Sequence, residues 1–382
     1  MNILFSLDNY DHGTGGAEMS MRALAHQLAA RGHAVQVLQR ADGIRRYDDG
    51  LIRVHTRPLP SGWLLRDADR DTLRWNRVWR PLLADFLREN PADLILTQNR
   101  LLYSTVDVAV ERRVPVAVFV RAFSMFCPTQ FRSRDALREC DRRCPKCLPW
   151  RMWLKYGRIQ ENLTSYEGGL RRATLLCANS RYMKEVIRRF YDIDAALVYP
   201  TVDLDRYQAE GANRDSVLFV KPQYVKGLPI LLEVAERAPD LRFLVAGDAG
   251  RHARQRLARL PNVECLGWVD DMRPVYARTR VLMGPSIWPE PFGRVFVEAA
   301  ASGIPSVASA RGGIPEAVGD GGILIDDIFD AGRWVAALRQ LQDPTVYLTL
   351  SNRARQHARR FAPGATVAQF LQSVQHGMGI AL

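Results

Sequence analysis

Two glutamates are separated by seven residues in the stretch 285–309, which reads PSIWPEPFGRVFVEAAASGIPSVAS. Glu290 lies between two prolines, so it belongs to a turn and not to a helix interior. After Gly293 the apolar residues have helical spacing, and Gly303 ends that helix. Glu298 is therefore expected about one turn inside a helix that begins shortly after Glu290.

The start of this helix offers backbone N–H groups that have no acceptor within the helix, those of Phe292, Gly293, Arg294 and Val295. A helix N-terminus attracts phosphate because these groups point outward and the helix dipole is positive there. With one carboxylate at its mouth and another one turn along, the stretch predicts a site for a ligand that carries phosphate and hydroxyl groups. The alternative is an ordinary strand–loop–helix with two incidental glutamates.

Two lysines add positive charge to this picture. Lys221 and Lys226 flank the loop KPQYVKG, between an apolar strand at 216–220 and a helix that begins near Leu228. Two cations beside a helix N-terminus suit a diphosphate. They are the only lysines after residue 200, amid nineteen arginines, so a general surface role is disfavoured.

Glu290, Pro-Phe-Gly and Glu298, with the apolar strand that follows them, closely resemble the donor site of the retaining family-four glycosyltransferases of the GT-B fold. The resemblance implies that Glu290 contacts the transferred sugar and that Glu298 binds the ribose hydroxyls of a nucleotide. It also implies that the amides at 292–295 hold sugar and phosphate. Lys221 stands where the family usually has Arg, which keeps the charge but loses the bidentate fork.

The N-terminal part has a related pattern. Residues 2–8 are predicted to form a strand, 17–31 a helix and 35–38 a second strand, which is a βαβ unit. Gly15 and Gly16 precede the helix and resemble the glycine-rich loop of the family's first domain; a simple turn is the alternative. Arg121 follows the strand 116–120 where many family members have His, so it is expected to contact phosphate and not to act as a base.

The resemblance predicts an α/β protein of the GT-B class, with two doubly wound Rossmann-like domains and a cleft between them. We expect an acceptor-side domain at 1–199 that carries a cysteine-rich insertion at about 124–150. A nucleotide-sugar-binding domain is expected at 200–362, and a terminal helix at 363–382 is expected to pack back on the first domain.

Four of the six cysteines lie in that insertion, as C-x12-C-x3-C-x2-C: Cys127, Cys140, Cys144 and Cys147. Four thiolates suit tetrahedral Zn²⁺, and the last pair has knuckle spacing. We interpret them as a structural zinc site, with an iron–sulfur cluster and four unligated thiols as alternatives. The remaining two, Cys177 and Cys265, are predicted to be buried in strands.

Bulk properties narrow the class of protein. The formal net charge is +12, and +10 of it comes from the first 200 residues. That part of the chain contains 32 of the 53 Lys and Arg residues and 22 of the 41 Asp and Glu residues. Such a surface suits nucleic acid, an anionic membrane or a phosphorylated substrate, and a solvated basic surface without a specific partner is the alternative. No apolar run approaches the roughly 18 residues of a spanning helix and no signal peptide is recognised. We therefore expect a cytoplasmic protein.

Two aromatic and basic segments bear on membrane contact. In 63–89 the aspartates among the arginines favour a core-facing helix over a membrane-surface helix. In 149–172, Trp150, Trp153 and Tyr156 accompany several basic residues, and both membrane or acceptor contact and packing against the cysteine loop stay open.

The resemblance implies transfer of a sugar from a UDP- or GDP-sugar to an acceptor hydroxyl with retention of configuration, and bacterial glycan or polysaccharide biosynthesis is the expected setting. Lys221, Lys226 and Glu290 would form the catalytic set, and no cofactor is expected for catalysis. The acceptor, whether a glycan, a lipid-linked or a small molecule, is not predicted. No nucleic-acid partner is expected. Alternatives are a nucleotide-sugar epimerase and a non-catalytic module that binds nucleotide sugar, membrane or nucleic acid.

Overall fold

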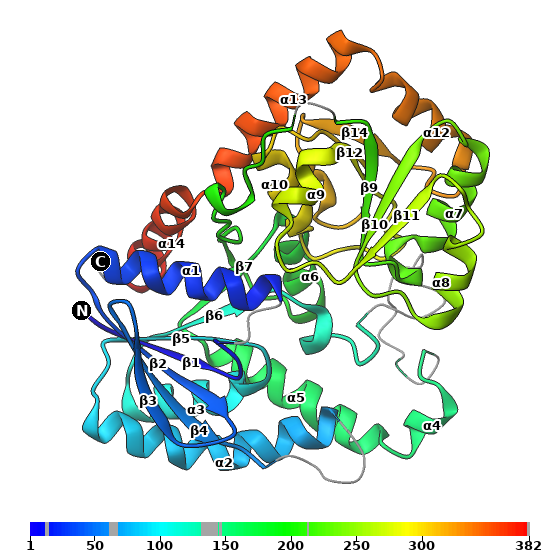
Figure 1. Cartoon of the computed structure of the whole chain (residues 1–382). Helices are drawn as coiled ribbons and strands as arrows, with labels where there is room; N and C mark the ends of the chain where they lie inside the picture. The colour runs from blue at the N-terminus through cyan, green and yellow to red at the C-terminus, as the bar shows by residue number, and fades with distance from the viewer. Residues whose placement is uncertain (12–14, 61–67, 131–143, 145–146, 212–213, 380–382) are drawn as a thin grey trace. The chain divides into compact units, whose positions relative to one another are not determined.

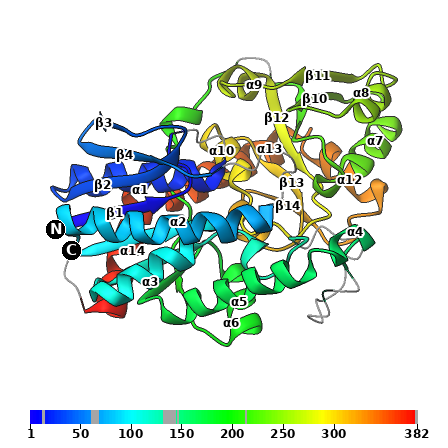
Figure 2. The same cartoon turned by 90° about the horizontal axis from the view of Figure 1, so that it is seen from below.

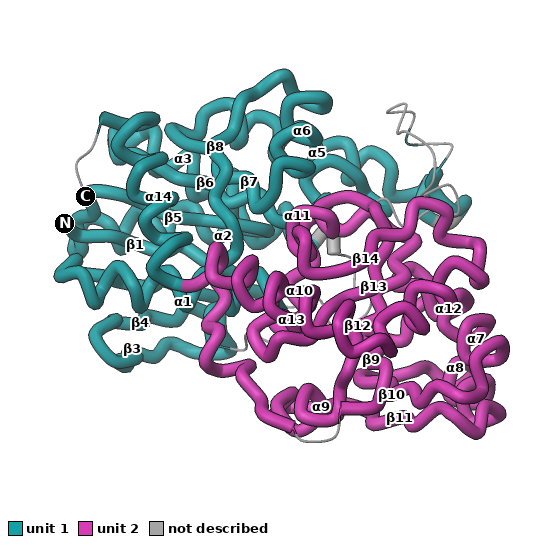
Figure 3. The backbone as a smooth tube through the Cα atoms, turned by 90° about the horizontal axis from the view of Figure 1, so that it is seen from above, with its two compact units in different colours: residues 1–133, 140–201, 363–382 teal, residues 134–139, 202–362 magenta. Residues whose placement is uncertain are grey.

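The chain forms two compact units, coloured separately in Figure 3. In this computed structural model the described residues are 1–11, 15–60, 68–130, 144, 147–211 and 214–379. Among the described residues, unit 1 comprises those of 1–201 together with 363–379, and unit 2 comprises those of 202–362. The last helix of the chain thus belongs to the unit that contains the first strand.

In unit 1 the described elements are, in chain order, β1 (Asn2–Leu7), α1 (Gly16–Ala30), β2 (Ala34–Ala41), β3 (Arg45–Asp49), β4 (Ile52–Pro58), α2 (Ala68–Glu89), β5 (Leu94–Gln98), η1 (Asn99–Leu101), α3 (Leu102–Arg112), β6 (Val116–Val120), η2 (Phe123–Met125), α4 (Trp150–Trp153), α5 (Tyr156–Arg172), β7 (Leu175–Ala178), α6 (Arg181–Tyr191), β8 (Ala196–Leu197) and α14 (Pro363–Met378).

The sheet of unit 1 has the order β3-β4-β2-β1-β5-β6-β7-β8 among the described strands. All of its neighbours are parallel except β3 and β4. Helices α1 and α14 cover one face, and α2, α3 and α5 lie side by side on the other (Figures 1 and 2). This is the expected doubly wound arrangement, in which the strand order reverses direction between β1 and β5.

The periodicity of the sequence explains the core of unit 1. Strands β5 (LILTQ) and β6 (VAVFV) are mainly apolar and are buried along their whole length, as strands covered by helices on both faces must be. From α14, Val367, Phe370 and Val374 join the same hydrophobic cluster as β1, α1 and β2. In α2, Trp75, Trp79 and Phe86 are buried, which confirms the core-facing interpretation of this helix. Trp63, Leu64 and Leu65 lie outside the described residues.

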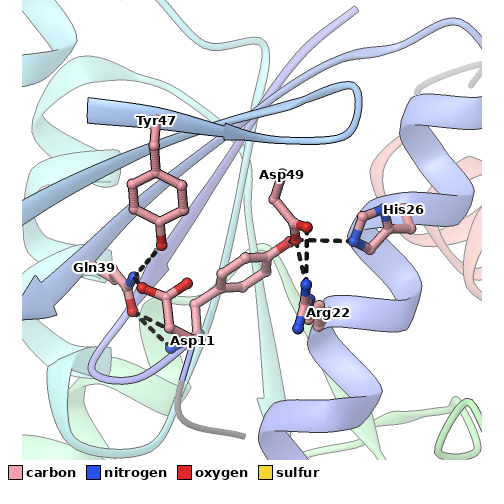
Figure 4. A network of polar contacts seen from close by, with 7 residues as sticks. Asp11, Arg22, His26, Gln39, Tyr47 and Asp49 are labelled. Atoms are coloured by element: carbon pink, nitrogen blue, oxygen red, sulfur yellow. Dashed lines mark hydrogen bonds and ion pairs between the residues drawn. The ribbon is translucent and has the colours of Figure 1, made fainter. Parts of the chain in front are cut away.

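A hairpin at the edge of this sheet is tied to α1 (Figure 4). Asp49, the last residue of β3, accepts hydrogen bonds from Arg22 at 2.8 and 3.0 Å and lies 2.9 Å from His26 Nε2. The Tyr10 hydroxyl donates to the same carboxylate at 2.8 Å. Hydrogen bonds from Arg22 and Tyr10, with the neighbouring charges, outweigh burial and lower the pKa of Asp49. The hairpin thereby anchors the loop that leads from β1 to α1.

In unit 2 the described elements are η4 (Asp205–Tyr207), β9 (Ser216–Val220), η5 (Tyr224–Lys226), α7 (Leu228–Arg237), β10 (Arg242–Ala246), α8 (Arg251–Leu257), β11 (Val263–Gly267), α9 (Arg273–Arg278), β12 (Thr279–Gly284), α10 (Arg294–Ala301), β13 (Ser306–Ser309), α11 (Ile314–Val318), β14 (Gly322–Ile325), α12 (Ala331–Gln340), α13 (Pro344–Ala358) and η6 (Arg359–Phe361).

The described strands of unit 2 are all parallel, in the order β11-β10-β9-β12-β13-β14. The order reverses between β9 and β12, so this is a second doubly wound sheet. Its main core joins β9, β10 and β12 to α7 and α12, around the fully buried Trp334. Ligands of such sheets bind outside the carboxyl ends of the strands at the reversal point, which here is where the loops after β9 and β12 meet.

Candidate active site

The loops that follow β9 and β12 are joined by backbone hydrogen bonds. The amides of Ile287 and Trp288 both donate to the carbonyl of Val225 at 3.0 Å. Gly227, next along the first loop, has φ +93, and a Cβ there would lie 1.9 Å from the carbonyl oxygen of Pro285. Only glycine allows this approach, so the KPQYVKG and PSIWPEPFG stretches are built to lie in contact.

Contact between the two loops brings Lys226 to Glu290. The Nζ of Lys226 lies 2.9 Å from Oε1 of Glu290, and their side chains are 18% and 12% exposed. The ammonium also lies 4.9 Å from the ring centroid of Trp288. On the other side, the carbonyl of Glu290 accepts from the amide of Gly313 at 2.7 Å. A mostly buried ion pair of this kind holds both side chains in one place.

Helix α10 begins directly after Gly293, which has φ +98 and contributes no side-chain cap. Phe292 is 2% exposed and packs on Phe361 with ring centroids 5.2 Å apart, which fixes the approach to the helix. Arg294 and Val295 are its first two residues, so their amides belong to the positive end of the helix dipole. An anion at this end would be stabilised by backbone groups and by the dipole together.

Glu298 lies in the next turn of α10, where its Oε1 accepts from Nε of Arg294 at 2.7 Å. Both side chains are mostly buried, at 15% and 11% exposed. Burial alone would lower the pKa of the Arg294 guanidinium, but the Glu298 carboxylate and Tyr207 outweigh it and raise that pKa. The sequence motif located both residues, but it did not reveal that their side chains interact.

Lys221 occupies the carboxyl end of β9 and is exposed. Its φ is +62, an uncommon conformation for a residue with a side chain, and its amide donates to the carbonyl of Ala246 at 2.8 Å. Gly247 approaches so closely that an added Cβ would lie 3.3 Å from the Lys221 backbone. Strained backbone of this kind is often found at ligand sites. Lys221 therefore lies at the same sheet edge as Lys226.

The residues of unit 1 that were predicted to bind the donor are Gly15, Gly16 and Arg121. They lie in segments that follow the carboxyl ends of β1 and β6 in the sheet of this unit. Gly15 precedes α1 in an extended conformation, and Gly16 is the first residue of that helix. Arg121 directly follows β6, is 7% exposed, and donates from Nη1 to the carbonyl of Ala17 at 3.0 Å. Its guanidinium carbon lies 4.7 Å from the centroid of the Phe119 ring. The arginine is thus held against the start of α1.

A polar cluster at the reversal point of unit 1 was missed from the sequence. Leu7 pairs with Gln39 and Ser6 with Thr97, so Asp8 emerges beside Arg40 and close to Gln98. Burial, followed by the charge of Glu18, raises the pKa of Asp8 to about 6. Its Oδ1 and both amide atoms of Gln98 are buried without a hydrogen-bond partner among the described residues. Their positions at the carboxyl ends of buried strands were the available signal.

The predicted zinc site receives no support. Cys127, Cys144 and Cys147 line one cavity of about 200 Å³ beside α5 and α6, whereas Cys140 lies outside the described residues. The described part of the chain contains no group of three or more His, Cys, Asp or Glu side chains placed to hold a metal ion. Cys177 is buried as predicted, but Cys265 is exposed, because β11 is an edge strand of its sheet.

Comparison with known families gives two matches that together cover most of the chain. The model of Glycosyltransferase Family 4 matches residues 14–206, and that of Glycosyl transferases group 1 matches residues 214–343. The chain belongs to glycosyltransferase family 4. The first match contains Gly15, Gly16 and Arg121, and the second contains both lysines and both glutamates of the site in unit 2. The family recognised from the Glu290–Glu298 motif is confirmed.

Among curated relatives, D-inositol 3-phosphate glycosyltransferase of Mycolicibacterium smegmatis is 32% identical over 210 residues, 48% of this chain and 47% of that protein. The chain spans about half the length of the curated relatives it matches.

Two solved structures share the fold along the whole chain. Sucrose-phosphate synthase of Thermosynechococcus elongatus has a TM-score of 0.75 at 19% identity, covering 99% of this chain and 100% of that one. Anabaena HepE in complex with UDP and glucose has a TM-score of 0.72 at 20% identity, covering 98% and 99%. These likenesses confirm the predicted GT-B class of two Rossmann-like units.

Proposed function

We propose that the protein transfers a sugar from a nucleotide diphosphate sugar to a hydroxyl group of an acceptor, with retention of configuration at the sugar. The observation that carries this proposal is the Lys226–Glu290 pair beside the N-terminus of α10. It sets a cation and helix amides, which suit a diphosphate, next to a carboxylate that suits sugar hydroxyls.

The chemistry follows from where charge develops. As the bond from sugar to phosphate breaks, negative charge grows on the leaving diphosphate, and Lys221, Lys226 and the amides at the start of α10 would stabilise it. Glu290 would orient the sugar through its hydroxyls, and Glu298 would bind the ribose. In front-face displacement the leaving phosphate itself accepts the proton of the attacking hydroxyl, so the enzyme needs no covalent nucleophile. The cations neutralise the diphosphate, so we assign no cofactor to catalysis.

We propose UDP- or GDP-sugars as donors, with UDP tested first because Anabaena HepE, which shares the fold, has been solved in complex with UDP and glucose. The acceptor is assigned to unit 1, at the polar cluster of Asp8, Gln98 and Arg40. Buried carboxylate and amide groups that lack partners among the described residues suit hydroxyl groups, which both donate and accept hydrogen bonds. Several curated relatives are named for D-inositol 3-phosphate, so a phosphorylated cyclitol is the first acceptor to test.

We also propose peripheral contact with a membrane. Trp150 and Trp153 of α4 are 74% and 59% exposed, and Leu154, which directly follows this helix, is 87% exposed. Aromatic side chains near basic ones are typical of membrane-surface segments. Among the described residues no helix is both long and apolar enough to span a bilayer.

Two other functions make different predictions. An epimerase would convert the nucleotide sugar without an acceptor and would need acid and base groups at the sugar. A non-catalytic module would bind nucleotide sugar, membrane or nucleic acid without turnover. The partly buried Lys226–Glu290 pair favours glycosyl transfer over both, since it is matched to a leaving diphosphate and not to proton abstraction.

The test combines binding with product analysis. Thermal shift with UDP, GDP and their sugars should show stabilisation of the wild type by one base, since a ligand of the folded state raises its stability. Glu298→Ala and Lys226→Ala should reduce the shift, whereas Glu236→Ala, at an exposed residue of α7, should retain it. NMR of the product with a phosphorylated cyclitol should show the donor's anomeric configuration. Inversion, or turnover of the donor into another nucleotide sugar, would contradict the proposal.

A further inference from the structure

The ion pair between Arg294 and Glu298 differs from other pairs with the same helical spacing. Arg171–Glu167 and Arg237–Glu233 also stand four residues apart, but their side chains are between 34% and 54% exposed. Those of Arg294 and Glu298 are 11% and 15% exposed. Exposed pairs contribute little to stability, whereas a buried pair must hold its geometry or leave a charge without compensation.

Helix stability does not explain why Arg294 occupies this position. It is the first residue of α10, where the helix dipole is positive and a cation is unfavourable. The order Arg then Glu along the helix is also the less favourable orientation for such a pair. The reason for an arginine here therefore lies in what its side chain contacts.

Two tyrosines interact electrostatically with the Arg294–Glu298 pair. Tyr207 comes from η4 and, together with Glu298, outweighs burial and helps to raise the pKa of Arg294. Tyr276 comes from α9, is 0% exposed, and lies close enough for the charge of Glu298 to raise the pKa of its hydroxyl further than burial already does. That hydroxyl has no hydrogen-bond partner among the described residues. The guanidinium is mostly buried and already donates from Nε to Glu298 at 2.7 Å, which restricts its movement.

We propose that Arg294 is the positioning residue for Glu298: it holds Oε1 through Nε, so that the carboxylate presents Oε2 to the two hydroxyls of the donor's ribose. This inference rests on the proposed function, in which Glu298 binds the ribose. It adds a side-chain role to a residue expected to contribute only its amide. A planar guanidinium fixes a carboxylate in orientation, which an ammonium does not.

The experiment measures how strongly the protein discriminates for ribose hydroxyls. Calorimetry gives the dissociation constants of UDP and GDP and of their 2′,3′-dideoxy forms, and the ratio between ribo and dideoxy forms is the readout. A hydrogen bond to a carboxylate predicts a ratio of roughly 10–100 for the wild type. Arg294→Gln should lower this ratio to about 3 or less, since Glu298 loses its orientation. Arg294→Lys should lie in between.

Controls separate positioning from stability. Tyr276→Phe removes only a hydroxyl that has no partner among the described residues, so it should leave the ratio unchanged. Glu298→Ala and the double variant Arg294→Gln/Glu298→Ala should give the same ratio, close to one, because Arg294 acts only through Glu298. If Arg294→Gln does not fold, Arg294→Lys carries the test.

An unchanged ratio in Arg294→Gln or Arg294→Lys, even with weaker binding overall, would overturn the inference and make Arg294 a purely structural residue. A double variant with a lower ratio than Glu298→Ala would also overturn it. If the wild type binds neither nucleoside diphosphate, the proposed function fails and the inference falls with it. If the wild type binds one but prefers no ribose hydroxyl, only the inference fails.

Discussion

Replacing Lys226 by Ala tests whether the Lys226–Glu290 pair is the buried interaction that the geometry describes. The charges are 2.9 Å apart, and both side chains are less than one-fifth exposed. At an effective dielectric constant of about 20, the attraction at this distance is about 6 kcal/mol before desolvation is subtracted. The variant would leave Glu290 buried without its cation.

Removing one partner of a buried ion pair lowers the free energy of unfolding by about 3–5 kcal/mol. Because both side chains keep some exposure to water, we expect a loss of about 3 kcal/mol for Lys226→Ala. In a domain of the size of unit 2, this lowers Tm by roughly 6–12 °C. The matched control is Arg237→Ala, which breaks an exposed pair of the same unit and should cost about 0.5 kcal/mol. Calorimetry without ligand, following the transition of unit 2, measures both.

A double-mutant cycle with Glu290→Ala sharpens this test. Since the two residues contact each other, their effects should be non-additive by at least about 1 kcal/mol. The loss in Lys226→Ala should persist at high salt, because buried pairs are poorly screened. Additive effects, or a Tm for Lys226→Ala within about 2 °C of the wild type, would refute the reasoning and place the pair among weak surface contacts.

Two further predictions concern backbone strain and pH. Gly227→Ala should lower the free energy of unfolding in urea by at least about 2 kcal/mol, because the residue has φ +93 and its Cβ would lie 1.9 Å from the Pro285 carbonyl oxygen. The control Gly250→Ala has open space around its Cβ and should change this free energy by less than about 1 kcal/mol. Because burial raises the pKa of Asp8 to about 6 from 3.8, the stability it contributes is complete below about pH 4 and is lost as pH rises through 6, up to roughly 3 kcal/mol. Asp8→Asn should therefore become more stable relative to the wild type as the pH rises from 4 to 7.5. If the difference in free energy of unfolding between variant and wild type is the same at both pH values, the raised pKa of Asp8 is contradicted.

The alternation of apolar strands and helices predicted parallel sheets covered by helices, because strands covered on both faces form distinctive apolar runs. The two doubly wound units came from the resemblance to the family. The β3–β4 hairpin was missed, although Asp49-Gly50 at its turn is a known hairpin signal. Its strands are rich in arginine and aspartate, which conceals the strand pattern. Cys265 was misplaced because an apolar run does not show which strand will be at the edge of a sheet.

The candidate site was predictable where a local motif carries it and not where distant segments meet. Glu290 and Glu298 could be placed around a helix start because prolines and glycines set that local structure. The contact between Glu290 and Lys226 depends instead on two loops that are joined by Val225 and Trp288, which spacing alone does not reveal. The cluster around Asp8 and Gln98 likewise requires the strand order, since these residues follow different strands.

Lys226 must satisfy two partners if it serves both Glu290 and a diphosphate. An ammonium has three N–H groups, so one hydrogen bond to Glu290 leaves two for phosphate oxygens. Glu290 and the Trp288 ring already restrict the lysine to one arrangement, so little side-chain entropy remains to be lost when the diphosphate binds. Arg294 restricts Glu298 in the same way. Each carboxylate of the motif is thus paired with a cation of its own unit, which is the preorganisation that the proposed electrostatic stabilisation of a leaving diphosphate would require.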